Sequence, residues 1–324
     1  MHTFILSPRA LPVLLAFGVL ALLPAVLPGF YVELAMKIMI LAIFALSLEL
    51  LVGQTGLICF GQAAFFGIGA YTVTLLSPEG EGAALGWVLP ASLTAAALYA
   101  VVVGALSLRT KGVYFIMITL AFAQMAYFVF HDTALGGGSD GIYLYFRPVL
   151  KLGAWQPFDL DKPQHLYYAV WACLIGTLVL LAVLLESRTG RAFAGIKANE
   201  QRMRAAGYST YPYKLGAFVL SAVLAGLAGF LYALKDGFVN PEILSWHHSG
   251  AVLIMIILGG LGHLRGAMLG ALAFTLLQEL FQSQAVFGSF AKHWQLMLGL
   301  TIIAFVALMP RGLVGLLQRG GRHG

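Results

Sequence analysis

The chain has 324 residues, of which 60% are hydrophobic and only 10% are charged, and its mean hydropathy is +0.89. A soluble globular protein carries about a quarter of its residues as charged side chains, so this composition excludes an ordinary cytosolic enzyme, a disordered chain and a nucleic-acid-binding domain. The net charge of +6 has another explanation, because membrane proteins concentrate Lys and Arg in their cytoplasmic loops. The composition therefore predicts an integral protein of the lipid bilayer, with no nucleic-acid partner.

Apolar runs recur along the chain at lengths close to the roughly 20 residues that a helix needs to cross a bilayer. They predict ten spans: Leu11–Phe30, Glu33–Val52, Gly56–Leu76, Ala84–Leu108, Gly112–Phe130, Leu166–Leu185, Leu215–Leu234, Gly250–Leu261, Gly266–Phe281 and Lys292–Met309. The eighth and ninth runs are short and interrupted by glycine, so eight or nine spans are an alternative. We expect an all-α fold, a polytopic bundle of about 8–10 transmembrane helices that forms one domain over residues 1–324.

The first run follows Arg9, and the apolar core of a signal peptide also follows a basic residue. Its apolar stretch is longer than the usual core of about 7–15 residues, and no clear A-x-A cleavage site comes after it. We therefore expect the first run to be kept as the first span.

Two hydrophilic segments interrupt the apolar pattern, at residues 131–165 and 186–214. Six of the 19 Lys and Arg residues lie between Arg188 and Lys214, whereas the segment 131–165 carries acids such as Asp132. Cytoplasmic loops carry the excess of Lys and Arg. We therefore expect the segment 186–214 and both termini on the cytoplasmic side, and the segment 131–165 outside.

The internal segment contains the pattern of a short amphipathic helix. Four apolar residues fall on one face of such a helix: Phe193, Ile196, Met203 and Ala206. Glu200 and Arg204 have the spacing of a favourable i,i+4 pair, and Gly207 is placed to end the helix. The helix would lie on the bilayer or insert into a groove of a partner protein. The alternative is a loop whose charges only set the topology.

Two glycine-rich stretches, Gly53–Gly56 and Gly259–Gly262, each precede a span rich in small residues. Transporters expose backbone groups to polar solutes where helices are broken, so a translocation path is the functional interpretation. The alternative is tight packing of helices through small residues. The candidates for either role are Gln54, Gly56, Gln62, Gly67, Gly69, Gln124, Gly259, Gly260, Gly262 and Gly266.

Charged side chains are sparse within the predicted spans, which contain Glu49 and Glu279, with Lys37 near enough to a span end for its ammonium to reach the membrane surface. Ion-driven carriers usually use more buried carboxylates, so this sparseness argues against ion coupling. The pair His247-His248 lacks the spacing of a zinc site and is expected in an interfacial loop. No metal site is predicted.

Two motifs bear on enzymatic activity. Residues Gly137–Gly141 match the G-x-S-x-G pattern of hydrolases, which needs a strand–turn–helix context that a glycine-rich loop after a span does not supply. The phosphate loop G-x-x-x-x-G-K-[ST] does not occur in the sequence. We expect a transport subunit without enzyme activity or cofactor of its own, and any nucleotide that powers transport must bind to another subunit.

Several segments, taken in order, resemble the permease subunit of the branched-chain amino-acid (LIV-type) ABC importers. They are Gly53–Gly56, Gly61–Tyr71, Lys111–Phe115, Thr119–Gln124, Gly136–Gly141, Gly190–Gly207, Tyr213–Gly229 and Leu258–Gly262. Together they cover the chain from about residue 35 to residue 310. The chain departs from the family at Gln62, where the family often has His, and at Lys197, where it often has Arg.

The resemblance implies a bacterial inner-membrane complex of two related permeases, two cytoplasmic ATPase subunits that bind ATP and Mg²⁺, and a periplasmic solute-binding protein. It implies that the segment 190–207 is the coupling helix that contacts an ATPase. The residues expected to carry this coupling are Gly190, Arg191, Phe193, Ile196, Asn199, Glu200 and Gly207. The implied solute is a branched-chain or related amino acid, carried by alternating access. A urea or short-amide permease of the same architecture and an ion-coupled secondary transporter are the alternatives.

Overall fold

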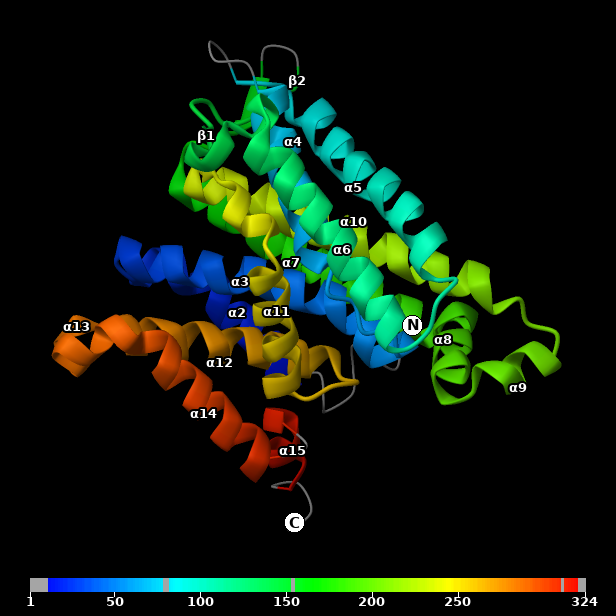
Figure 1. The fold of residues 1–324 in the computed structure, drawn as a ribbon. Coiled ribbons are helices and arrows are strands. Elements are labelled where there is room, and N and C mark those ends of the chain that lie inside the picture. Colours follow the sequence, from blue (N-terminus) through cyan, green and yellow to red (C-terminus); the bar gives the residue numbers. More distant parts are fainter. Residues whose placement is uncertain (1–10, 78–81, 153–154, 310–311, 320–324) are drawn as a thin grey trace.

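The computed structural model describes residues 11–77, 82–152, 155–309 and 312–319, which form a bundle of helices with a few short strands (Figure 1). Ten helices correspond to the ten predicted spans. They are α2 (Leu11–Val26), α3 (Gly29–Glu49), α4 (Gln62–Leu76), α5 (Leu85–Ser107), α6 (Val113–Asp132), α7 (Pro163–Glu186), α10 (Thr210–Asp236), α11 (Trp246–Gly259), α12 (Leu264–Gln282) and α14 (Trp294–Leu308). The expected helical, polytopic membrane fold is confirmed.

Not all of these helices are long enough to cross a bilayer. Seven helical segments of the described residues have the length and apolar composition for it, whereas α2, α4 and α11 contain 16, 15 and 14 residues. A helix of 15 residues is about 23 Å long, less than the roughly 30 Å of a bilayer core. The first and third spans are therefore shorter than predicted, whereas α11 begins four residues earlier and ends two residues earlier than the predicted eighth span. Helices α4 and α11 both adjoin breaks in the helical chain.

Shorter elements connect the spans. The π-helix η1 (Leu50–Thr55) continues α3, and a hairpin of α8 (Arg188–Ala198) and α9 (Glu200–Ala205) lies between α7 and α10. The remaining elements are η2 (Ala134–Gly136), η3 (Gly138–Asp140), β1 (Ile142–Tyr143), β2 (Leu150–Leu152), β3 (Trp155–Phe158), β4 (Phe238–Val239), η4 (Pro241–Leu244), α13 (Gln284–Phe287), η5 (Gly288–His293) and α15 (Gly312–Arg319).

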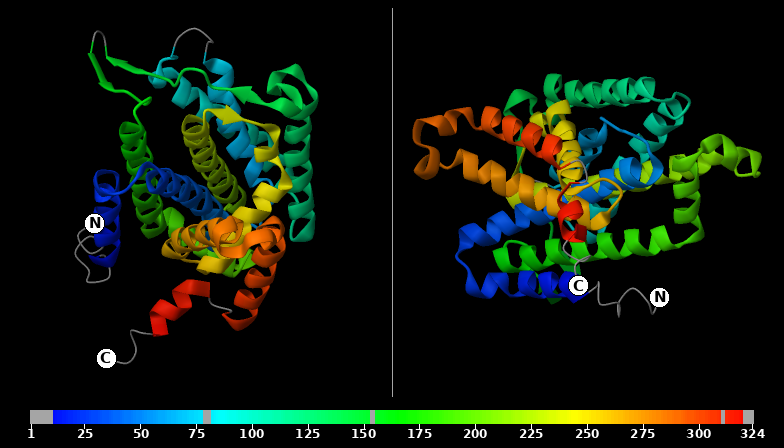
Figure 2. Two further views of the ribbon diagram at one scale, coloured as in Figure 1. Left: turned by 90° about the vertical axis from the view of Figure 1, so that its left-hand side faces the viewer. Right: turned by 90° about the horizontal axis from the view of Figure 1, so that it is seen from below.

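The centre of the bundle is the contact of α10 with α3, α4 and α5 (Figure 2). Gly69 of α4 and Gly226 of α10 let their two backbones touch, because a Cβ at Gly69 would overlap the Gly226 carbonyl group. Gly229 meets the carbonyl oxygen of Phe66 in the same way. Small residues thus bring helices close together here, as their spacing predicted.

The segment expected outside folds against the end of α10 that is distant from α8 and α9 (Figure 1). Its strand β1 pairs antiparallel with β4 through Ile142 and Val239, and Arg147 Nε donates to the Leu234 carbonyl oxygen at 2.7 Å. Strands β2 and β3 form a separate hairpin. The motif Gly137–Gly141 lies in 3₁₀ turns after α6, so it does not have the strand–turn–helix context of a hydrolase nucleophile.

Two local expectations about polar residues are wrong. His247 and His248 lie in the first turn of α11 rather than in a loop, and the His248 ring stacks on Phe44 at a centroid distance of 5.5 Å. The ammonium of Lys37 is not free but donates to Glu279 Oε1 at 2.7 Å, which joins α3 to α12. In apolar surroundings a charged group is stabilised more by an opposite charge than by isolation.

Candidate functional site

The chain leaves regular helical geometry between α3 and α4. The π-helix η1 ends at Thr55, Gly56 adopts the left-handed conformation at φ 75°, and α-helix resumes only at Gln62. The third span therefore begins at Gln62 rather than at Gly56. Gly53 has a separate role within η1, since a Cβ there would overlap the carboxylate of Glu49. π-Helical turns are rare and often lie at functional sites.

A second break separates α11 from α12. Gly260 and Gly262 have φ values of 112° and 89°, which side chains other than glycine rarely adopt. The two helices then run back against each other, because a Cβ at Gly259 would overlap the carbonyl oxygen of Gly266. Between α11 and α12, glycine thus serves both purposes: Gly260 and Gly262 form the break, and Gly259 and Gly266 allow the two helices to pack closely.

The two breaks lie against each other. Gly262 N–H donates to Glu49 Oε1 at 2.7 Å, and Gln54 Nε2 donates to the Gly262 carbonyl oxygen at 3.2 Å. Glu49 is fully buried, and its Oε2 has no hydrogen-bond partner among the described residues. Backbone groups released at a break in a membrane helix need partners from elsewhere in the protein, and Glu49 and Gln54 provide them.

The loop helix α8 reaches the same place. Lys197 Nζ donates to the carbonyl oxygen of Gly53 at 2.6 Å, and the Lys197 side chain passes so close to Gly56 that a Cβ there would lie 3.3 Å from Lys197 Cγ. Lys197 also lies near enough to Glu49 for their charges to attract. We call the set Glu49, Gly53, Gln54, Lys197 and Gly262 the junction.

The expected single helix over residues 193–206 is wrong, because Asn199 adopts extended geometry at φ −162°. Its Oδ1 accepts from the Arg202 N–H at 3.0 Å, which is the cap that Asn favours at the start of a helix. The apolar stripe is divided accordingly. Phe193 and Ile196 of α8 are buried, whereas Ala206, after α9, is exposed.

Glu200 fastens α9 to the first turn of α10. Its Oε1 accepts from Thr210 Oγ1 at 2.9 Å and lies 2.6 Å from Arg204 Nη2 and 3.0 Å from Lys214 Nζ. Burial alone would raise the pKa of Glu200, but hydrogen bonds from Lys214 and Thr210, together with the charge of Lys214, outweigh it and lower the pKa to about 2. The expected pair with Arg204 is thus present within a larger network that holds the hairpin in place.

Of the other predicted coupling residues, Gly190 is buried against the bundle, whereas Arg191 and Gly207 are exposed. Gly190 is buried, and a Cβ there would overlap the Leu185 carbonyl group at the end of α7. Gly207 has φ 86° and directly follows the last turn, as expected of a helix-ending glycine. Arg191 is exposed. Within the described chain, no hydrogen bond or ion pair engages its guanidinium.

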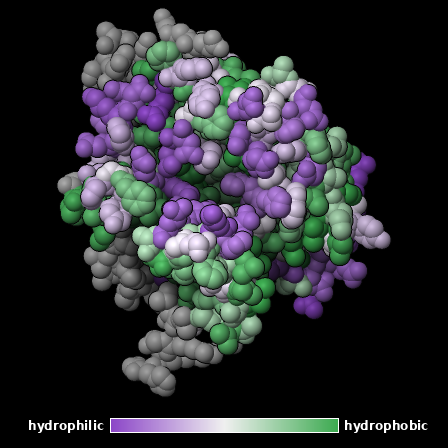
Figure 3. Space-filling model, turned by 60° about the vertical axis from the view of Figure 1, so that its left-hand side comes forward, coloured by the Kyte–Doolittle hydropathy of each residue, from purple (hydrophilic) through white to green (hydrophobic). Residues whose placement is uncertain are grey.

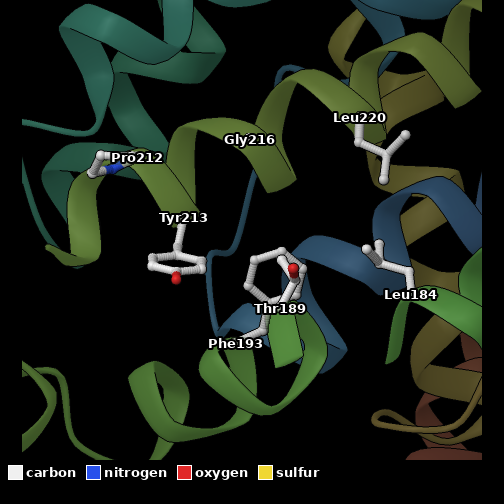
Figure 4. Close-up of a pocket in the computed structure, with 7 residues that line it drawn as sticks. All are labelled: Leu184, Thr189, Phe193, Pro212, Tyr213, Gly216 and Leu220. Atoms are coloured by element: carbon white, nitrogen blue, oxygen red, sulfur yellow. The ribbon is translucent and has the colours of Figure 1, made fainter. Parts of the chain in front are cut away.

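An apolar cavity of about 330 Å³ separates α8 from α7 and α10. Phe193 from α8 and Tyr213 from α10 both point into the space between their helices (Figure 4). Its lining is formed by Leu184, Thr189, Phe193, Pro212, Tyr213, Gly216 and Leu220. The hairpin is therefore joined to the bundle by polar contacts at Lys197 and Glu200. Beside Phe193, its packing against α7 and α10 leaves a cavity.

The remaining candidates lie apart from the junction. Gln62 is fully buried and donates to Ser47 Oγ at 2.8 Å and Ser221 Oγ at 3.0 Å, which joins α4 to α3 and α10. Gly67 packs against η4, and the side chain of Leu244 occupies the space that a Cβ at position 67 would need. Gln124 lies in α6, and its buried Nε2 has no partner among the described residues. Gly69, Gly259 and Gly266 lie in helix contacts.

The structure thus brings together three of the predicted residues: Gln54 and Gly262, which are hydrogen-bonded, and Gly56, which lies against Lys197. Sequence reasoning did not select Glu49 and Lys197, although it noted the charge of both. For Glu49 the available signal was its position four residues before Gly53, since a carboxylate one helical turn from a glycine can fold back over it. Lys197 carried no such signal, because its partner lies 144 residues away in the sequence.

Residues 30–306 match the family model described as the permease component of the branched-chain amino acid transport system. The high-affinity branched-chain amino acid transport system permease protein LivM of Escherichia coli (strain K12) is 30% identical over 302 residues, which cover 87% of this chain and 69% of that protein. LivM of Salmonella typhimurium gives the same values. The autoinducer 2 import system permease protein LsrC of Photorhabdus laumondii is 31% identical over 151 residues, which cover 43% of this chain and 45% of LsrC. No solved structure matches the chain significantly.

Proposed function

Since the chain belongs to the branched-chain amino acid permease family of ABC transporters, we propose that it forms half of the translocation path of an importer for branched-chain or related amino acids. A second, homologous permease supplies the other half, and two ATPase subunits bind ATP and Mg²⁺. A hollow lined by hydrophilic side chains on one face of the molecule (Figure 3) supports this proposal. A polar, concave face is unfavourable against lipid and favourable along an aqueous path.

The observation that carries the proposal is the α8–α9 hairpin. It extends beyond the ends of α7 and α10 (Figure 1), and Glu200 ties it to α10 from the inside. Arg188, Arg191 and Arg202 of the hairpin are all exposed. A short helix that is fixed on its inner side and basic on its outer side is suited to dock into a groove of a partner. We assign that partner as an ATPase subunit.

ATP can drive transport only if its binding to the partner subunits favours one of the two packings of the permeases over the other. ATP in the partner subunits favours one packing of the permeases only if the partners hold the hairpin differently in the two states. At the junction the main chain is held by side chains from distant segments rather than by regular helical hydrogen bonds, and this is where we expect the packing to change. The energy source lies outside this chain.

The location proposed is the bacterial inner membrane, with a periplasmic binding protein that delivers the solute. The segment 186–214, which contains the hairpin and six basic residues, is assigned to the cytoplasm because cytoplasmic loops are rich in Lys and Arg. The β1–β4 end then faces the periplasm. Both termini are assigned to the cytoplasm for the same reason, since Arg9 lies near the N-terminus and Arg311, Arg319 and Arg322 lie near the C-terminus.

The similarity to LivM covers twice as much of the chain as the similarity to LsrC, 87% against 43%, and this favours amino acids as the solute. Urea or a short amide is the alternative within the same architecture. The test is uptake by proteoliposomes that contain both permeases and both ATPases, supplied with the binding protein. We expect ATP-dependent uptake of leucine, isoleucine or valine, and uptake of urea or acetamide instead would change the solute. Uptake without any ATPase would overturn the proposal in favour of a secondary transporter.

A further inference from the structure

The junction places two helix ends of opposite polarity side by side. Gly53 lies in the last turn of the α3–η1 helix, where carbonyl oxygens have no partner within the helix. Gly262 lies just before α12, at the end where N–H groups have no helical partner. A helix carries partial negative charge at its C-terminus and partial positive charge at its N-terminus.

Each of these ends is capped by a side chain of opposite charge from another part of the chain. Lys197 of α8 donates to the Gly53 carbonyl oxygen at 2.6 Å, and Glu49 of α3 accepts from the Gly262 N–H at 2.7 Å. Both contacts are charge-assisted hydrogen bonds. The one that crosses from the hairpin to the bundle is the Lys197 contact.

The two caps depend on each other. Glu49 is buried with one oxygen unpaired among the described residues, and a buried carboxylate is costly without compensating charge. The Gly262 N–H and the charge of Lys197 both favour the charged form of Glu49. Moving Lys197 away would favour the neutral carboxyl group instead, which accepts a weaker hydrogen bond from Gly262 than a carboxylate does. The cavity beside Phe193 leaves α8 space for such a displacement.

We propose that Lys197 and Glu49 are positioning residues that transmit movement of the cytoplasmic hairpin to the two helix breaks. When α8 moves, the hydrogen bond from Lys197 moves the end of η1 at Gly53. The hydrogen bond between Glu49 and Gly262 then moves the start of α12. The inference rests on the proposed function, since it takes a nucleotide-dependent partner to move the hairpin. It adds the internal route by which that movement reaches the middle of the bundle.

The test uses the complete transporter with one reporter thiol at Leu261→Cys, after Cys59→Ala and Cys173→Ala. Leu261 is 47% exposed and lies between the two left-handed glycines, so a polar maleimide can reach it. We expect that a non-hydrolysable ATP analogue changes the labelling rate of this thiol. Lys197→Met should reduce that change by between about twofold and thirtyfold, the range for a charge at a helix end. Lys197→Arg, which keeps the donor and the charge, should restore it.

Two further variants separate transmission from general loss of structure. Glu49→Gln keeps an acceptor for Gly262 but removes the charge, and it should weaken the response as Lys197→Met does. Lys37→Met removes an ion pair between the same helices α3 and α12 but lies outside the junction, and it should leave the response intact. An unchanged response in Lys197→Met would overturn the inference alone. If nucleotide leaves the thiol unaffected while the reporter transporter still takes up solute with ATP, the inference fails and the proposed function stands. If the reporter transporter takes up solute without any ATPase, the proposed function fails and the inference with it.

Discussion

The contact between α4 and α10 and the junction of the two helix breaks both depend on glycine, for different physical reasons. Between α4 and α10, glycine lets two main chains touch, since a Cβ at Gly229 would overlap the Phe66 carbonyl oxygen. At the junction, Gly262 has nothing within 4 Å of its missing Cβ and is needed for its φ of 89°. The first contact fixes one packing, whereas the second leaves main-chain groups held by distant side chains. Substitutions should accordingly impair folding in the first region and transport in the second.

Gly229→Val is expected to have the largest effect, because neither main chain can yield without separating α4 from α10. Overpacking of a core costs about 1–3 kcal/mol and sometimes more, and we expect about 3 kcal/mol or more here. Size-exclusion profiles and thermal unfolding of the detergent-solubilised protein measure it. Gly216→Val is the matched control on the same helix, since no atom lies within 4 Å of its Cβ position. A normal profile and melting temperature for Gly229→Val would contradict the rigid-contact interpretation.

The second prediction tests the α8–α9 hairpin, through which we expect movement to reach the junction. Replacing Arg191 by Ala and Glu200 by Gln together should reduce uptake at least about tenfold, which corresponds to about 1.4 kcal/mol of coupling, while the ATPases remain active. Arg191 would lose its outward contact, and the carboxylate that binds Lys214 and Arg204 would lose its charge. Uptake and ATP hydrolysis are measured in the same proteoliposomes, with Lys235→Ala at the other end of α10 as control. Normal uptake in the double variant would exclude the hairpin as the coupling element.

The sequence predicted features that depend on local spacing and missed those that depend on contacts between distant segments. Apolar runs located ten helices, and Gly207 and the Glu200–Arg204 pair were located from helical periodicity. The break at Asn199 was missed, because apolar spacing continues through it and only the cap interaction with Arg202 ends α8. Glu49 and Lys197 were missed as site residues, because their partners are reached only once the bundle has formed.

Gly262→Ala tests whether the backbone conformation of the α11–α12 break matters for uptake as well as for thermal stability. Left-handed geometry costs an alanine roughly 1–2 kcal/mol, and the cost falls on the segment that has to rearrange, so uptake should fall about fivefold. Gly288→Ala is the matched control, since Gly288 also has a positive φ, 54°, and an open Cβ position but lies between α13 and η5. We expect equal losses of thermal stability in the two variants and a loss of uptake only in Gly262→Ala. Equal uptake would show that the conformation of the break is not limiting for transport.

The smallest expected effect concerns pH and the Glu200 network. Burial alone would raise the pKa of Glu200, but the hydrogen bonds from Lys214 and Thr210 and the charge of Lys214 lower it from 4.5 to about 2. The unfolded segment therefore binds a proton more readily than the folded one, and the stabilisation is complete above pH 4.5 and lost as the pH falls toward 2. The difference in melting temperature between the native chain and Glu200→Gln should thus be constant from pH 8 to pH 5 and decrease only below pH 4.5.

That constancy distinguishes the Glu200 network from a pH-sensitive contact. A carboxylate whose charge persists throughout the neutral range keeps α9 attached to α10 at every physiological pH, so protons do not control this attachment. If the difference in melting temperature between the native chain and Glu200→Gln changed between pH 8 and pH 6, a group that titrates near neutrality, such as a histidine, would control the hairpin instead. The hairpin would then respond to protons as well as to its partner, and the attachment of α9 to α10 through Glu200 would not be the constant contact described above.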